Sequence, residues 1–133
     1  MECPNCHTPM IVLELDQIEI DFCDGCRGIW LDAGELELLL EGAANRDELM
    51  SRLSRQVAGK ERQLKCPICD KKMDKVVASV EGSGQTVRVD KCARDHGIWF
   101  DDGELHDVLQ MGSDFEGNKI FDLLKDMFGR QGA

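Results

Sequence analysis

The sequence has no apolar run that approaches the roughly 20 residues needed to cross a membrane. It opens directly into Glu2 and Cys3, without the basic stretch and the apolar stretch of a secretory signal. We therefore expect a cytoplasmic protein, kept in a reducing environment and without a membrane segment. The glycines at positions 82 and 84 are not followed by Gly-Lys-Ser/Thr, so this stretch is not a phosphate-binding loop.

Basic residues are scarce in the first third of the chain. Residues 1–42 contain one, Arg27, against ten acidic residues, and the whole chain of 133 residues has a formal net charge of −10. Because contacts with phosphates supply most non-specific affinity for nucleic acids, this charge disfavours a broad nucleic-acid-binding surface. Nucleic-acid binding stays an alternative, through the basic excess of residues 43–65 and through six basic residues near the second repeat described below: Lys71, Lys72, Lys75, Arg88, Lys91 and Arg94.

The chain contains an internal repeat, which determines how the rest is interpreted. Residues 28–36 read Gly-Ile-Trp-Leu-Asp-Ala-Gly-Glu-Leu, and residues 97–105 differ from them at two of these nine positions. A Cys-Pro-x-Cys sequence precedes each copy, at residues 3–6 and 66–69. We infer two modules of roughly forty residues, a size at which buried surface alone rarely offsets the lost chain entropy, so that metal or disulfides are needed.

The cysteines fit metal binding better than disulfides. Their two-residue gaps suit the tight turn of a metal knuckle, and seven is an awkward number to pair. In the first module two such pairs are separated by a predicted hairpin, which brings together four thiolates, the closed tetrahedral set that zinc accepts. Iron in the same four-sulfur geometry is the chief rival. The ligands are Cys3, Cys6, Cys23 and Cys26.

The second module departs from this pattern, because Asp95 aligns with Cys26 and a histidine follows it. An imidazole reaches farther from its backbone than a thiolate, so a shift of one residue is tolerable. The predicted ligands are Cys66, Cys69, Cys92 and His96. Each site is then filled by protein ligands, with no position for the water of a catalytic zinc, so we expect two structural Zn²⁺ ions, no catalytic residues and no enzyme activity. We interpret His7 and Asp70, which follow knuckles, as residues suited to a positive φ.

Alternation of apolar and polar residues predicts a β-hairpin in each module. The first pairs residues 11–15 with 18–22, and the second pairs residues 75–80 with 86–90. We interpret Trp30 and Trp99 as the largest parts of two small cores.

Helices are also expected in both modules, in the connector and in the C-terminal segment. A short one should span residues 33–41 after a capping box in which Asp32 and Glu35 bond to each other's backbone N–H groups, and Asp101 and Glu104 should repeat this arrangement. Residues 43–63 have the spacing of a connecting helix, and residues 113–133 contain an amphipathic one. The apolar face of the last helix should pack on the modules, or else against a second copy in a homodimer.

The pattern Cys-Pro-x-Cys, hairpin, Cys-x-x-Cys-x-Gly-Ile-Trp-Leu-Asp-x-Gly-Glu-Leu resembles the TFIIB-type zinc ribbon, or transcription factor zinc-finger, family. The resemblance covers about residues 1–41 and 64–110, and implies zinc held by the cysteines of both modules, with His96 in place of the fourth cysteine of the second. The predicted fold is a small metal-stabilised α+β protein. Its parts are a zinc ribbon at 1–42, a helical connector at 43–63, a second ribbon at 64–112 and a C-terminal helix and tail at 113–133.

The function that follows is non-enzymatic. We expect two structural zinc ribbons that act as a scaffold for contacts with a protein partner, whose identity the sequence does not give. The family name suggests a role in transcription or its regulation, although a shared fold does not establish a function.

Overall fold

The computed structural model describes residues 1–15, 18–39, 46–53, 64–79, 86–102, 104–105 and 108. The first half contains the strands β1 (Ile11–Leu15), β2 (Ile18–Phe22) and β3 (Ile29–Asp32), followed by the helices α1 (Glu35–Leu39) and α2 (Arg46–Leu53). The second half contains β4 (Asp74–Ser79), β5 (Thr86–Lys91) and β6 (Gly97–Phe100). Both predicted hairpins are confirmed, the second with each strand displaced by no more than one residue at its ends.

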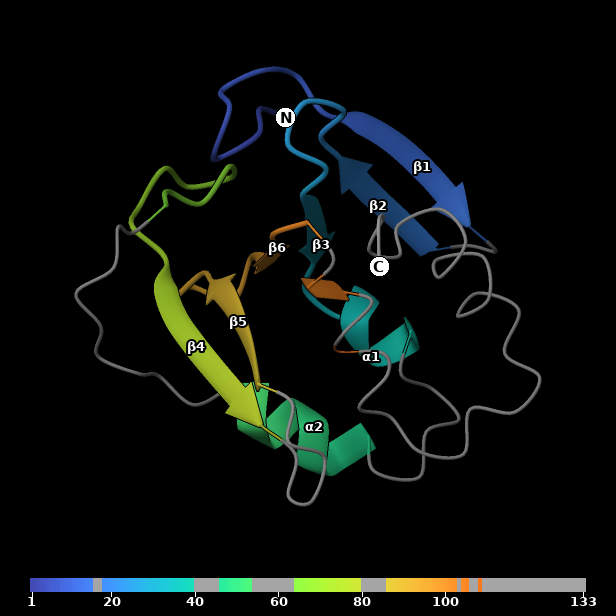
Figure 1. The fold of residues 1–133 in the computed structure, drawn as a ribbon, viewed down its shortest axis with the longest axis vertical. Helices are drawn as coiled ribbons and strands as arrows, with labels where there is room; N and C mark the ends of the chain where they lie inside the picture. The colour runs from blue at the N-terminus through green and yellow to red at the C-terminus, as the bar shows by residue number, and fades with distance from the viewer. Residues whose placement is uncertain are drawn as a thin grey trace.

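The strands of both modules form one six-stranded antiparallel sheet in the order β1-β2-β3-β6-β5-β4 (Figure 1). The junction is the pair β3 and β6, in which Trp30 is opposite Trp99, Ile29 opposite Phe100 and Leu31 opposite Ile98. These residues are equivalent in the repeat, so a local twofold axis relates the modules and passes between the two tryptophans. This pairing was not predicted from the sequence. The Gly-Ile-Trp segments were interpreted there as links between a knuckle and a helix, and not as strands.

Glycine at positions 28 and 97 allows the tryptophan of the other module to approach the backbone closely at this junction. A Cβ atom at Gly28 would overlap the indole of Trp99, and a Cβ at Gly97 would overlap the indole of Trp30 and the carbonyl oxygen of Leu31. Glycine within a strand often marks such a close approach. The tryptophan of each module therefore packs against the glycine of the other module, where a larger residue would not fit.

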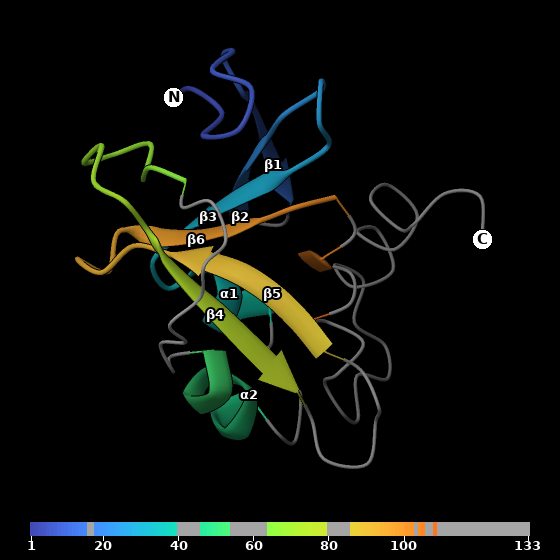
Figure 2. The same cartoon turned by 60° about the vertical axis from the view of Figure 1, so that its left-hand side comes forward.

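The sheet separates two buried clusters. On one face the knuckles and both tryptophans come together, whereas the other face carries an aliphatic core under α1 and α2 (Figure 2). Both tryptophans have no exposed surface, which confirms that they are core residues. The aliphatic core includes Ile20, Leu31, Val89, Phe100 and Leu105.

The described helices cover part of the predicted ones. The structure describes α1 over five residues and α2 over eight, so a helix along the whole connector 43–63 is not supported. Residues 43–45 and 54–63, and the predicted C-terminal helix at 113–133, lie outside the described residues. None of the helices in the described part of the chain is long and apolar enough to cross a membrane.

Candidate metal centres

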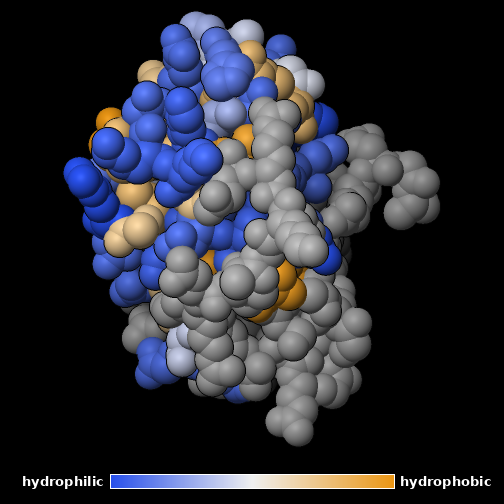
Figure 3. Space-filling model, turned by 90° about the vertical axis from the view of Figure 1, so that its left-hand side faces the viewer, coloured by the Kyte–Doolittle hydropathy of each residue, from blue (hydrophilic) through white to orange (hydrophobic). Residues whose placement is uncertain are grey.

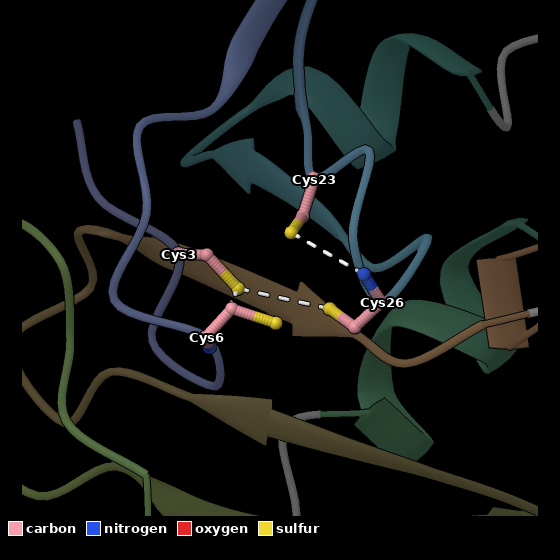
Figure 4. Close-up of side chains that lie close together, drawn as sticks. All are labelled: Cys3, Cys6, Cys23 and Cys26. Carbon is pink, nitrogen blue, oxygen red and sulfur yellow. Dashed lines mark hydrogen bonds between the residues drawn. The ribbon is translucent and has the colours of Figure 1, made fainter.

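Four cysteines of the first module converge on one point (Figure 4). Cys3 and Cys6 come from the turn before β1, and Cys23 and Cys26 from the turn after β2. Their sulfur atoms all lie within 4.8 Å of one another, and the Sγ atoms of Cys3 and Cys26 are 3.7 Å apart. A tetrahedral zinc with Zn–S bonds of about 2.3 Å separates its sulfurs by about 3.8 Å. The four thiols thus have the spacing that the metal requires.

Backbone N–H groups of the knuckles point at the sulfurs. The amides of Asn5 and Cys6 donate to Cys3 Sγ at 3.4 and 3.2 Å, and the amide of Cys26 donates to Cys23 Sγ at 3.5 Å. Such bonds stabilise thiolates, which are the form that binds metal. The turns are closed by residues with a positive φ, among them His7 at 62° and Asp70 at 60°, which confirms the conformational interpretation of these two residues.

The second cluster uses a histidine in the fourth place. Cys66, Cys69, Cys92 and His96 also lie with their ligand atoms within 4.8 Å of one another. The Nδ1 atom of His96 is 3.5 Å from Cys92 Sγ and 3.9 Å from Cys66 Sγ, and the two sulfurs of Cys69 and Cys92 are 3.7 Å apart. Three sulfurs and one imidazole nitrogen make a set that structural zinc accepts.

The turn geometry explains why the fourth ligand moves by one residue. In the first module Cys26 precedes the residue with positive φ, Arg27, whose N–H bonds to the carbonyl of Cys23 four residues back. In the second module the residue with positive φ is Asp95, whose N–H bonds to the carbonyl of Cys92 only three residues back. The tighter turn places its fourth ligand, His96, after the reversal, where the longer imidazole can reach the sulfurs.

The thiols of the two clusters differ widely in pKa. Burial raises the pKa of Cys3 to about 12 and that of Cys66 to about 11. Burial acts the same way on Cys23, but hydrogen bonds from the Cys26 amide and neighbouring thiols outweigh it and lower that pKa to about 7. The Lys71 amide is the main cause that lowers the pKa of Cys69 to about 7. Each cluster therefore holds thiols of unequal acidity, because burial and hydrogen bonds act to different extents on each sulfur.

The acidic residues of the repeat have partners other than those predicted. The indole N–H of Trp30 donates to Asp32 Oδ1 at 2.9 Å, and that of Trp99 donates to Asp101 Oδ1 at 3.1 Å. The Glu104 carboxylate accepts from the backbone N–H of Arg88 on β5 at 3.3 Å. The capping-box interpretation is corrected accordingly. The carboxylates of Asp32 and Asp101 accept from buried indole N–H groups, and that of Glu104 accepts from a backbone N–H of β5.

Comparison with known proteins gives one family. Residues 2–42 match the family model described as transcription factor zinc-finger. The comparisons with curated proteins and with solved structures found no match. The matched range contains the complete first cysteine cluster, and the second cluster at residues 66–96 is consistent with a second copy of the same ribbon. The family match and the two clusters together indicate a zinc-binding structural protein.

Proposed function

We propose that this protein binds two Zn²⁺ ions in two structural ribbon sites and uses the resulting rigid sheet as a scaffold for a protein partner. The observation that carries the proposal is the pair of clusters, each with four convergent soft ligands at the spacing of a zinc tetrahedron. When bound, zinc would be held by Cys3, Cys6, Cys23 and Cys26 in one site and by Cys66, Cys69, Cys92 and His96 in the other.

The role proposed for the metal is structural. Catalytic zinc keeps one position for water or substrate, whereas four protein ligands close the coordination sphere. Two of the four ligands in each site, Cys3 and Cys23 in the first and Cys66 and Cys92 in the second, have almost no exposed surface. In this arrangement the metal fastens both knuckles onto the same face of the sheet, next to the paired tryptophans.

Native mass spectrometry of the purified full chain tests the metal content, and two zinc ions per chain are expected. Replacing zinc by Co²⁺ then separates the two sites, because cobalt absorption differs between four-sulfur and three-sulfur, one-nitrogen coordination. His96→Ala should alter one of the two signals and leave the four-sulfur signal, whereas Cys6→Ala should do the reverse. A chain that binds iron in preference, or no metal, would contradict the proposal.

The scaffold role is tested by affinity capture with the zinc-loaded chain, which should retain a protein after nuclease treatment. The transcription role suggested by the family name predicts that this partner belongs to the transcription apparatus. Recovery of nucleic acid without any protein would reject the scaffold role.

Nucleic-acid binding is the second candidate, and the structure describes part of its basic set. Lys75 is mostly buried and lies 2.9 Å from Asp90, and Lys91 lies 3.6 Å from Asp95, so acidic neighbours offset both charges. A mobility-shift assay at low salt tests this candidate, since binding through phosphates weakens steeply as salt rises.

A further inference from the structure

The two outer edges of the sheet are equivalent in the repeat but differ in chemistry. Ile11 and Val12 on β1 stand where Asp74 and Lys75 stand on β4. Edge strands present unpaired N–H and C=O groups, and proteins commonly protect them with charged residues or with a covering element. The edge strand β4 carries Asp74 and Lys75, and α2 packs against this strand. Figure 3 views the molecule from the β4 side, where the described residues are mainly hydrophilic.

Among the residues that the structure describes, Glu14 is the one charged residue of β1, and no helix contacts this strand as extensively as α2 contacts β4. There β1 pairs with β2 alone, and it lies at the outer limit of the sheet (Figure 1). Ile11 keeps 49% and Val12 keeps 60% of its surface exposed, which places them among the most exposed large apolar residues described. A short apolar edge strand of this kind can accept an extended peptide as an additional strand.

The charge beside β1 defines what such a peptide must carry. In the register of β1 with β2, Val12 is opposite Asp21 and Glu14 is opposite Glu19. Directly opposite residues in an antiparallel pair lie on the same face, so this face of the edge carries three acidic side chains around Val12. The other face carries Ile11 and Leu13, and Leu13 packs on the aliphatic core. The edge is thus acidic on one face and apolar on the other.

We propose that β1 is a docking edge for an extended protein segment in which basic residues alternate with apolar ones. The segment would add a seventh strand beside Ile11–Leu15, with a basic side chain beside Glu14, on the face that also carries Asp21 and Glu19 of β2, and with its apolar side chains beside Ile11 and Leu13. This inference rests on the proposed scaffold function, for which it names the surface and the chemistry of the partner.

A second copy of the chain fits this edge less well. Pairing β1 with another β1 would bring together two segments that each carry ten acidic residues and one basic residue over positions 1–42. Like charges placed opposite each other on paired strands are destabilising. Charge complementarity therefore favours a basic segment of another protein.

The test uses the zinc-loaded full chain and a capped hexapeptide, Lys-Val-Lys-Val-Lys-Val, with the scrambled peptide Lys-Lys-Lys-Val-Val-Val as its control. Amide chemical shifts should change along β1 with the alternating peptide and much less with the scrambled one. Two N-methylated forms, one at the valines and one at the lysines, should differ in affinity, because alternate amides of an added strand face its neighbour.

A pair of variants locates the site. Val12→Lys gives β1 the residue found on β4 and should weaken binding about tenfold, a loss of about 1.4 kcal/mol. Leu38→Lys makes the same change of charge at a residue of α1 that is 50% exposed, and it should leave the affinity unchanged. Shifts that map away from β1, equal binding of the scrambled peptide, or equal affinity of both N-methylated forms would overturn the docking edge.

Two further results separate this inference from the proposed function. If the chain binds two zinc ions and a captured partner is insensitive to Val12→Lys, the scaffold stands and the docking edge fails. If sedimentation shows a dimer of the chain that Val12→Lys dissociates, the edge binds a second copy and the proposed occupant is wrong. A chain that binds no zinc contradicts the proposed function directly.

Discussion

Trp30 lies directly opposite Trp99 in the antiparallel pair of β3 and β6, and the indole of each sits over the glycine that precedes the other's strand motif. The two tryptophans are buried completely and stand beside both cysteine clusters. The centre of the molecule is therefore shared by the two ribbons, and its properties should respond to changes in either one.

Gly28→Ala should destabilise the zinc-loaded protein. The added methyl group would overlap Cζ2 and Cη2 of Trp99, and overpacking of a closed core costs about 1–3 kcal/mol. Urea unfolding measures the loss. Gly25→Ala is the control, since its Cβ would lie at an ordinary 3.7 Å from the nearest sulfurs, and it should change little.

A double variant tests the cause of this effect. Phenylalanine lacks the outer indole ring that carries the overlapping atoms, so Trp99→Phe should cost less in the Gly28→Ala background than in the wild-type background. Additive losses would show that the glycine acts through something other than the tryptophan.

Loss of one metal site should loosen both ribbons. Cys92→Ser removes a buried ligand of the second site, and the strand β6 that follows it supports β3. Because metal binding free energy is folding free energy in small domains, the first site should bind zinc more weakly than in the wild type. Competition with a chelator measures its affinity, and an unchanged affinity of the four-cysteine site would mean that the ribbons are independent.

Asp32→Ala should leave the buried indole N–H of Trp30 without its acceptor, at a cost of about 1–3 kcal/mol. Asp32→Asn keeps an acceptor oxygen and should recover most of the stability. If both variants lose the same amount, the carboxylate acts through its charge and the hydrogen bond is not its main contribution.

Lys75→Met should be among the most destabilising single changes outside the cysteine clusters. Asp90 is 1% exposed, burial raises the pKa of its carboxyl despite the neighbouring Lys75 ammonium, and the two groups are 2.9 Å apart. Breaking such a pair from one side costs about 3–5 kcal/mol, whereas removing both charges is often nearly neutral. Thermal unfolding of Lys75→Met and of Lys75→Met with Asp90→Leu measures the difference, and equal losses would contradict a buried pair.

Local patterns predicted the hairpins and the side chains that gather in the two clusters. The spacing of Cys3 and Cys6 specifies a knuckle, and alternation over residues 18–22 specifies a half-buried strand, since each depends on neighbours in the chain. The pairing of β3 with β6 depends on contacts between residues about seventy positions apart, which no local pattern reports. The one local indication of this pairing was the glycine that precedes Ile-Trp in both copies of the repeat, since glycine in a strand often marks a close approach.

The acidic residues show a second limit of local patterns. Asp32 and Glu35 have the spacing of a capping box, but a buried tryptophan two residues before Asp32 competes for the same carboxylate. An unpaired indole N–H in the core costs more than an unpaired amide at an exposed helix end, where water can replace the carboxylate. The position of Trp30 in the core therefore decided the partner of Asp32.

The twofold relation between β3 and β6 gives the chain the interface of a homodimer within a single polypeptide. Two separate ribbons could form that interface only by meeting in solution, whereas linkage within one chain raises the effective concentration of each ribbon at the other. The same contacts can form between halves of different chains, as in domain swapping. Covalent linkage thus turns assembly into folding, and it frees each half to diverge, one toward an edge with Asp74 and Lys75 and the other toward an edge with Ile11 and Val12.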